Sequence, residues 1–145
     1  DALMSRGLGD VYKRQAKLIS PDEKPDEKYP LVLTTGRLLE HWHTGSMTSR
    51  SKVLNTIEPQ PYVHLSKNEM RKNNFSQDEQ VQLSTRRGKV SVKVRFDKMI
   101  PDGMVFMPFC FENAPANLLT NQALDPDGKI PELKYCAAKI EKLTA

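Results

Sequence analysis

Hydrophobic and polar residues alternate most regularly between residues 80 and 96. The apolar series is Val81, Leu83, Val90, Val92, Val94 and Phe96. Arg86-Arg87-Gly88 interrupts it, and polar residues fill most of the positions between. A period of two residues places successive side chains on opposite faces of a strand. The pattern predicts a β-hairpin with one buried face and one solvent-exposed face.

Four other apolar runs predict further strands. They cover residues 31–35, 62–65, 104–109 and 135 to about 141. The run at 104–109 is apolar on both faces, as is typical of a strand central to a barrel. A long loop is expected between the first strand and Pro61. Around six strands of this length indicate a small, mainly β barrel.

A short helix is predicted directly after the second strand. Ser66 and Glu69 have the spacing of a capping box, in which each side chain satisfies a free N–H group of the other. Asn73-Asn74 supply a left-handed stop roughly two turns later. Met70 is expected on the inner face of this helix.

The chain divides at Tyr29. Residues 1–28 repeat a Pro-Asp-Glu-Lys unit and carry too little apolar surface to pack, so we expect a disordered linker. The first fifteen residues also resemble a translated sequencing adaptor, which suggests a non-native leader. Residues 29–145 are expected to form one domain.

Charge and composition exclude several classes of protein. The 22 Lys and Arg exceed the 18 Asp and Glu by only four, without the interleaved basic and aromatic residues typical of nucleic-acid binding. We interpret the basic run Arg86 to Lys89 as a solvated turn. No apolar run approaches the about eighteen residues of a membrane span. Cys110 and Cys136 lie in apolar surroundings, which predicts free thiols in a soluble, cytoplasmic protein.

The segment after the first strand has the chemistry of a nucleotide-type binding loop. An apolar run ends at Thr34-Thr35-Gly36-Arg37. Glycine lets the backbone approach a ligand closely, hydroxyl and N–H groups donate to phosphate oxygens, and Arg37 can form two parallel hydrogen bonds. These four residues alone form a common string, and a polar loop after a strand is its structural alternative.

His41 and His43 are conceivable metal ligands, because residues two apart share one face of a strand. No third ligand is evident in the sequence, so we predict no metal site. No residue pattern marks an activated nucleophile, and we predict no catalytic residue. Trp42 is expected to pack the loop onto the barrel.

A second polar segment follows the strand at 104–109. Residues 112–117 offer Asn side chains that both donate and accept hydrogen bonds, as recognition of a pterin edge requires. Ordinary turn formation is the alternative, since Asn and Pro are frequent turn residues.

Three stretches together resemble one known domain. They are YPLVLTTGRLLEHWHTGSMTSRS, GMVFMPFCFENAPANLLTNQALDP and PELKYCAAKIEKL. The chain resembles the C-terminal, molybdopterin-dinucleotide-binding domain of the molybdenum and tungsten oxidoreductases (the DMSO reductase superfamily), most like the large (alpha) subunit of formate dehydrogenase. The resemblance implies a double-psi β-barrel of the aspartate-decarboxylase-like type, with one or two short helices.

The resemblance also implies a cofactor and the residues that bind it. The cofactor is bis(molybdopterin guanine dinucleotide) carrying Mo or W, whose metal is held by its own dithiolenes and a residue of another domain. The implied cofactor-binding residues are Thr35, Gly36, Arg37, His41, His43, Thr44, Met47, Thr48, Asn117 and Lys134. Arg37 and His41 are the most specific on the dinucleotide, and Asn117 and Lys134 approach the pterin.

On this interpretation the chain is inactive alone and works with the remaining domains of a large subunit, together with iron–sulfur and electron-transfer subunits. The substrate is formate or a relative such as nitrate. Two alternatives are a freestanding cofactor-binding subunit of a formylmethanofuran dehydrogenase-type complex, and a non-redox double-psi barrel adaptor. The polar loop after the first strand argues against the adaptor, which has no need of it.

Overall fold

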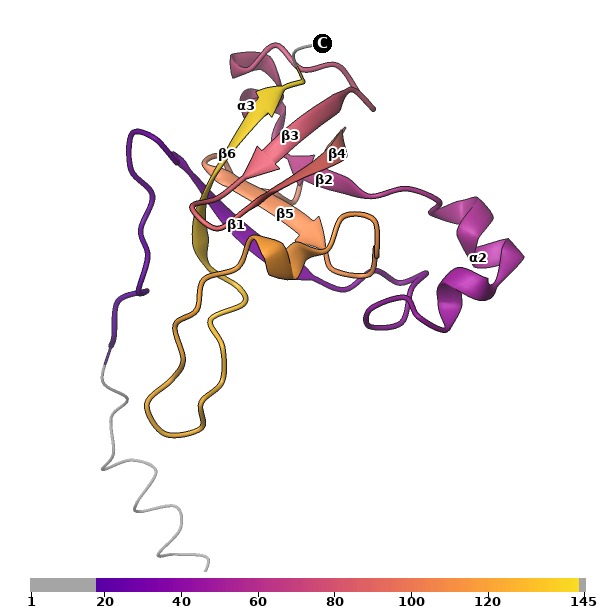
Figure 1. The fold of residues 1–145 in the computed structure, drawn as a ribbon. Coiled ribbons are helices and arrows are strands. Elements are labelled where there is room, and N and C mark those ends of the chain that lie inside the picture. Colours follow the sequence, from indigo (N-terminus) through magenta and orange to yellow (C-terminus); the bar gives the residue numbers. More distant parts are fainter. Residues whose placement is uncertain (1–17, 144–145) are drawn as a thin grey trace, which may run out of the picture.

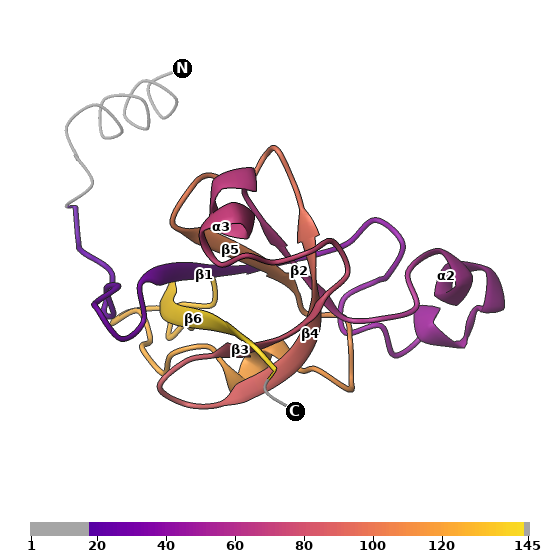
Figure 2. The same cartoon turned by 90° about the horizontal axis from the view of Figure 1, so that it is seen from above.

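Six strands close into one barrel in the computed structural model, which describes residues 18–143. Their order around the barrel is β1-β5-β2-β4-β3-β6 (Figures 1 and 2). The strands are β1 (Leu31–Gly36), β2 (Tyr62–Leu65), β3 (Gln80–Ser84), β4 (Lys89–Phe96), β5 (Met104–Pro108) and β6 (Cys136–Lys142). The prediction of a mainly β, six-stranded barrel is therefore confirmed.

Two pairs of neighbouring strands are parallel and the other four pairs are antiparallel. β1 runs parallel to β5, with Val32 opposite Met104 and Gly36 opposite Pro108. β2 runs parallel to β4. This arrangement is consistent with the double-psi barrel. It also means that β1 and β5 end at the same end of the barrel, where Phe109 N donates to Gly36 O over 3.1 Å.

The inward side chains of the strands fill the barrel, as the alternation predicts. Val81, Leu83, Val92 and Val94 are fully buried. The series of buried side chains ends at Val94, because Phe96 is 49% exposed. It is the last residue of β4, so no continuing strand covers its ring.

The helix α3 (Lys67–Lys72) begins and ends where the sequence predicts. The Ser66 side chain accepts a hydrogen bond from Glu69 N over 3.2 Å, and Asn74 takes the left-handed conformation with φ of 54°. Met70 is buried, as expected. The Glu69 carboxylate, however, accepts from Gly103 N over 3.3 Å and so ties the helix to the start of β5.

The long loop between β1 and β2 contains helical turns that the sequence analysis missed. A 3-10 turn, η1 (Thr48–Arg50), leads into the helix α2 (Lys52–Ile57), and the Ser51 side chain caps α2 at Leu54 N. Neither element has a buried residue. Figures 1 and 2 both show α2 projecting away from the barrel. We call residues 37–61 the excursion.

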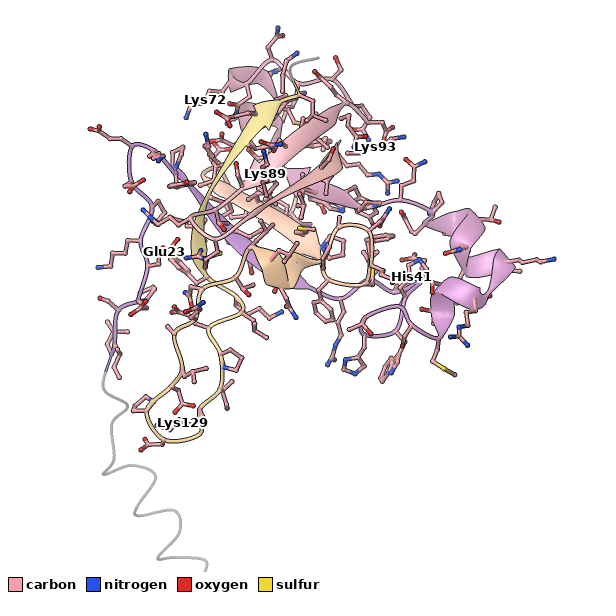
Figure 3. All side chains as sticks on the ribbon, in the orientation of Figure 1. Glu23, His41, Lys72, Lys89, Lys93 and Lys129 are labelled. Carbon is pink, nitrogen blue, oxygen red and sulfur yellow. The ribbon has the colours of Figure 1, made fainter. Side chains whose placement is uncertain are left out.

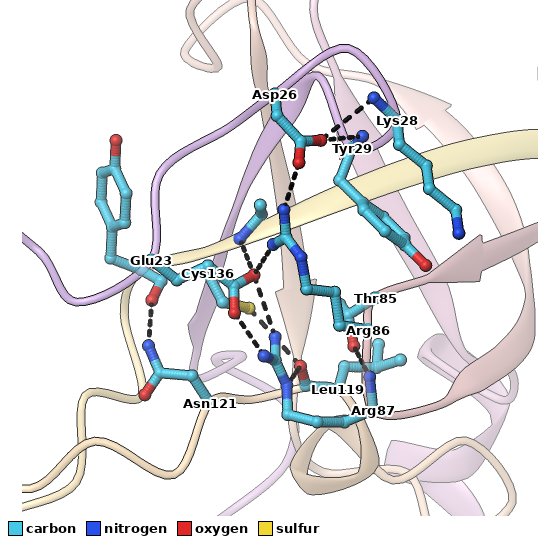
Figure 4. A network of polar contacts seen from close by, with 12 residues as sticks. Glu23, Asp26, Lys28, Tyr29, Thr85, Arg86, Arg87, Leu119, Asn121 and Cys136 are labelled. Carbon is cyan, nitrogen blue, oxygen red and sulfur yellow. Dashed lines mark hydrogen bonds and ion pairs between the residues drawn. The ribbon is translucent and has the colours of Figure 1, made fainter.

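The segment that precedes β1 is anchored to the barrel. We call residues 22–29 the strap. Its Glu23 side chain forms an ion pair with Arg86 and accepts hydrogen bonds from Arg87, both in the β3–β4 turn (Figure 4). It also accepts from Ala137 N over 2.8 Å. Asp26 pairs with Arg86.

Arg86 is exposed, as the interpretation of a solvated turn expects, but the Arg87 side chain is only 21% exposed. Both residues pair with partners some sixty residues earlier in the chain. Of the predicted linker, residues 1–17 lie outside the described residues. Over residues 18–28 the chain has no helix or strand. Within residues 18–143, no helix combines the length and the apolar character needed to cross a membrane.

Candidate functional site

Three segments that are far apart in the sequence meet at one end of the barrel. The excursion leaves the carboxyl end of β1, and residues 109–118 leave the carboxyl end of the parallel strand β5. β6 is antiparallel to β1, with Cys136 opposite Leu33, so the residues just before β6 arrive at the same end. The barrel topology thus gathers all three sequence regions from which site residues are predicted.

Thr35 and Lys134 are brought into direct contact by this convergence. Lys134 Nζ donates to Thr35 O over 2.5 Å, although the two residues are 99 positions apart. The buried Thr35 hydroxyl donates to Leu133 O over 2.7 Å. These bonds join the end of β1 to the approach to β6 and place one ammonium group there.

Gly36 has a packing role in addition to the predicted backbone approach. A Cβ atom built at this residue would lie 2.4 Å from the ring of Phe106. Any side chain here would therefore displace that ring from its place on the neighbouring strand β5. The next residue, Arg37, is exposed and does not line the cleft described below.

His41 is buried where the excursion meets the barrel, with 4% of its surface exposed (Figure 3). Its Nε2 lies 2.9 Å from Glu58 O, and because a carbonyl oxygen can only accept, Nε2 carries a hydrogen. Its Nδ1 lies 3.2 Å from Thr48 Oγ1, and the same oxygen accepts from Trp42 N over 3.1 Å. Both ring nitrogens are therefore engaged within the protein.

His43 lies on the outside of the same loop. It is exposed, has a φ of 49°, and packs edge-on against Trp42 with ring centroids 4.7 Å apart. The buried His41 and the exposed His43 do not share a face, as they would on a strand. Trp42 is 64% exposed, so the expectation that it packs the loop onto the barrel is wrong. Trp42 instead holds the loop through its backbone N–H, which donates to Thr48 Oγ1. The Met47 side chain is exposed as well.

Gly45 gives the excursion a second fixed point on the barrel. Its φ is +76°, a conformation that glycine adopts without strain. A Cβ atom there would lie 2.3 Å from Cys110 O, so the loop backbone touches the segment after β5. The sequence shows Gly45 but not this contact.

A cleft of about 850 Å³ lies between the excursion and the segment after β5. Its lining includes three of the predicted residues, His41, Thr44 and Asn117. Asn113, from the polar segment 112–117 noted in the sequence, also lines it, as do the unpredicted Ser46, Ser49 and Asn55, beside the rings of Phe109 and Phe111. The cleft thus combines hydrogen-bonding groups with two flat apolar surfaces.

The remaining predicted residues do not line this cleft. Thr35 and Gly36 are buried in the barrel end, and Lys134 is held against Thr35. The additional lining residues were missed because Ser and Asn are ordinary loop residues. Only the run of Asn in residues 112–117 gave a signal in the sequence.

The chain is similar to known proteins over almost all of its described length. It matches the family described as "Molydopterin dinucleotide binding domain" over residues 31–137. It is 44% identical, over 94% of its length, to F420-dependent formate dehydrogenase 1 subunit alpha of Methanococcus maripaludis. It is 40% identical, over 97% of its length, to F420-dependent formate dehydrogenase subunit alpha of Methanocaldococcus jannaschii.

These matches cover 20% and 21% of the two relatives, so the chain spans about a fifth of their length. Among solved structures, acetylene hydratase from Pelobacter acetylenicus has the same fold, with a TM-score of 0.73. The match covers 81% of this chain and 19% of that one, at 20% identity.

Proposed function

The chain belongs to the molybdopterin dinucleotide binding domain family, and from this premise we propose that it is the cofactor-enclosing domain of a formate dehydrogenase alpha subunit. A molybdopterin-type dinucleotide is the cofactor class of the family. We propose the guanine form, bis(molybdopterin guanine dinucleotide), with molybdenum or tungsten. The observation that carries the proposal is the convergence of three distant segments on one cleft at one end of the barrel.

The cleft has the size and the chemistry to hold one part of such a cofactor. Its volume of about 850 Å³ falls within the range of small-molecule sites, roughly 300–1,000 Å³. Hydroxyl and amide groups can donate to phosphate oxygens and pair with the donor and acceptor edge of a pterin or a purine. The rings of Phe109 and Phe111 offer apolar surface to a flat heterocycle. The exposed Arg37 adds a guanidinium that can bind two phosphate oxygens at once.

The proposed binding residues divide into two groups by what their polar atoms already do. Arg37, His43, Thr44, Met47 and Asn117 are exposed and are proposed to touch the cofactor. Thr35, Gly36, His41, Thr48 and Lys134 are engaged within the protein and are proposed to shape the site. The bound metal supplies the redox chemistry, while this domain binds, orients and encloses the organic part.

Our proposal for the whole enzyme is based on the two relatives. We propose that residues outside this chain supply the metal ligand and the iron–sulfur centres, and that formate is the substrate, with coenzyme F420 as in the relatives' names. We further propose that the domain alone is inactive and that the enzyme is cytoplasmic, which agrees with the two buried free cysteines.

The two relatives favour this function over the alternatives from the sequence. Both are alpha subunits about five times as long as this chain, which supports a domain of a large subunit over a freestanding one. An adaptor function would leave the convergence of polar segments on the cleft without a purpose.

The experiment removes the exposed guanidinium from the parent subunit. Arg37→Ala should lower the molybdenum or tungsten and the pterin retained per subunit, because a bidentate phosphate contact is lost. Arg71→Ala is the matched control, since Arg71 is also exposed but lies on α3, at the opposite end of the barrel. Equal cofactor content in the two variants would contradict the assignment of Arg37.

A further inference from the structure

The excursion has very little hydrophobic support of its own. Of residues 37–61, only His41, Gly45 and Pro61 are buried. Several of its large apolar side chains are exposed, including Leu39, Met47 and Val53. Helices of this length are not stable without packing. Specific contacts with the barrel must therefore fix the position of the segment that forms one wall of the cleft.

Arg95 of β4 forms an ion pair that joins the barrel to the excursion. Its Nη1 lies 3.0 Å and 2.9 Å from the two carboxylate oxygens of Glu58, the residue that ends α2. Its guanidinium lies 3.8 Å from the centre of the Tyr62 ring, and its Nε lies 3.5 Å from Asp78. The ring and the two carboxylates hold the guanidinium in one orientation.

Glu58 connects Arg95 to the buried His41. Its side chain binds Arg95, and its backbone carbonyl accepts the hydrogen of His41 Nε2. The other ring nitrogen contacts Thr48 Oγ1, which accepts from Trp42 N. One chain of contacts thus runs from β4 through Glu58 and His41 to the loop around Trp42.

We propose that Arg95 is a positioning residue for the cofactor site. Arg95 does not line the cleft and acts by holding Glu58. Glu58 in turn fixes the His41 ring, and the ring fixes the wall of the cleft that carries Thr44 and Ser49. The buried His41 ring then holds the loop in place through its two nitrogens. The inference rests on the proposed function, because it is the cofactor that needs a fixed wall.

The first test needs no cofactor. Trp42 is the single tryptophan of this 145-residue chain, so its fluorescence anisotropy reports the motion of the excursion. Arg95→Met keeps the length of the side chain but removes its charge and its hydrogen bonds. We expect a loss of anisotropy and about tenfold faster exchange of the Trp42 amide.

Lys142→Met is the matched control, because it breaks an ion pair between Lys142 of β6 and Glu79 that involves no residue of the excursion. Glu58→Gln is a second variant, which keeps Arg95 over Tyr62 and so covers the case in which Arg95→Met fails to fold. Unchanged anisotropy and amide exchange in the folded variants would overturn the positioning role, whatever the cofactor does.

The second test is made in the parent subunit. Arg95→Met should release the cofactor about tenfold faster. Arg95→Lys should restore only part of the retention, since an ammonium lacks the second nitrogen that reaches Asp78 and the flat face that stacks on Tyr62. A loosened excursion with unchanged retention would overturn the role of Arg95 in cofactor binding. The proposed function itself would fail if the unmodified parent subunit retained no molybdopterin-type cofactor, and the two failures are thereby told apart.

Discussion

Replacing Glu23 of the strap by glutamine tests whether this segment is part of the domain. The Glu23 side chain is 12% exposed and accepts from Arg86, Arg87 and Ala137 N. Burial opposes its ionisation, but the hydrogen bonds from Arg87 and Ala137 N and the two positive charges outweigh burial. The pKa of Glu23 is therefore below its ordinary value of 4.5.

The magnitude follows from the exposure of the partners. Exposed ion pairs contribute roughly 0–1 kcal/mol, and breaking a fully buried pair costs roughly 3–5 kcal/mol. Arg87 and Arg86 are 21% and 37% exposed, so this cluster lies between the two limits. Glutamine keeps the size and can still accept from Ala137 N. We expect Glu23→Gln to lower the free energy of unfolding by about 2 kcal/mol, and the Tm by roughly 6–10 °C.

The assay is thermal unfolding of the 145-residue chain as a function of pH. Since the pKa of Glu23 is lowered by folding, its contribution is present above pH 4.5 and is lost as the pH falls through the folded value. The difference between wild type and variant should therefore vanish in acid. Glu27→Gln is the matched control, because Glu27 has the same place in the second Pro-Asp-Glu-Lys unit but is exposed. Equal Tm values for the two variants at pH 7 would refute this reasoning.

Two further predictions concern the loop contacts of the cleft. Gly45→Ala should lower the cofactor content of the parent subunit, because the new Cβ would lie 2.3 Å from Cys110 O. Gly103→Ala is the control, because Gly103 has a similar φ of +78° but nothing within 4 Å of a new Cβ. It should cost only about 1 kcal/mol of stability and leave the cofactor content unchanged. Burial raises the pKa of Cys110 to about 11, so its thiol should resist alkylation by iodoacetamide at pH 8 in the folded chain. Mass spectrometry should find that thiol modified only after unfolding, and rapid modification of the folded chain would contradict the burial of this residue.

The local features of the fold were predictable because their causes are local. Strand alternation depends on residues two apart, and it placed Val81, Leu83 and Val92 in the core. The Ser66 cap depends on a residue three positions away. The helix α2 was missed because its residues follow no apolar period, and none of them is buried.

The amino-acid sequence by itself therefore determined the strands, the barrel class and the family to which the domain belongs. The tertiary structure decided which residues pair through hydrogen bonds and salt bridges. Barrel closure brings Lys134 to Thr35 and Glu23 to Arg87, and it turns His41 inward against Glu58 O. Hydrogen bonds and ion pairs depend on distances of a few ångströms between residues that sequence spacing leaves unrelated. Which polar groups face the cofactor and which hold the wall of its site is consequently a property of the closed barrel.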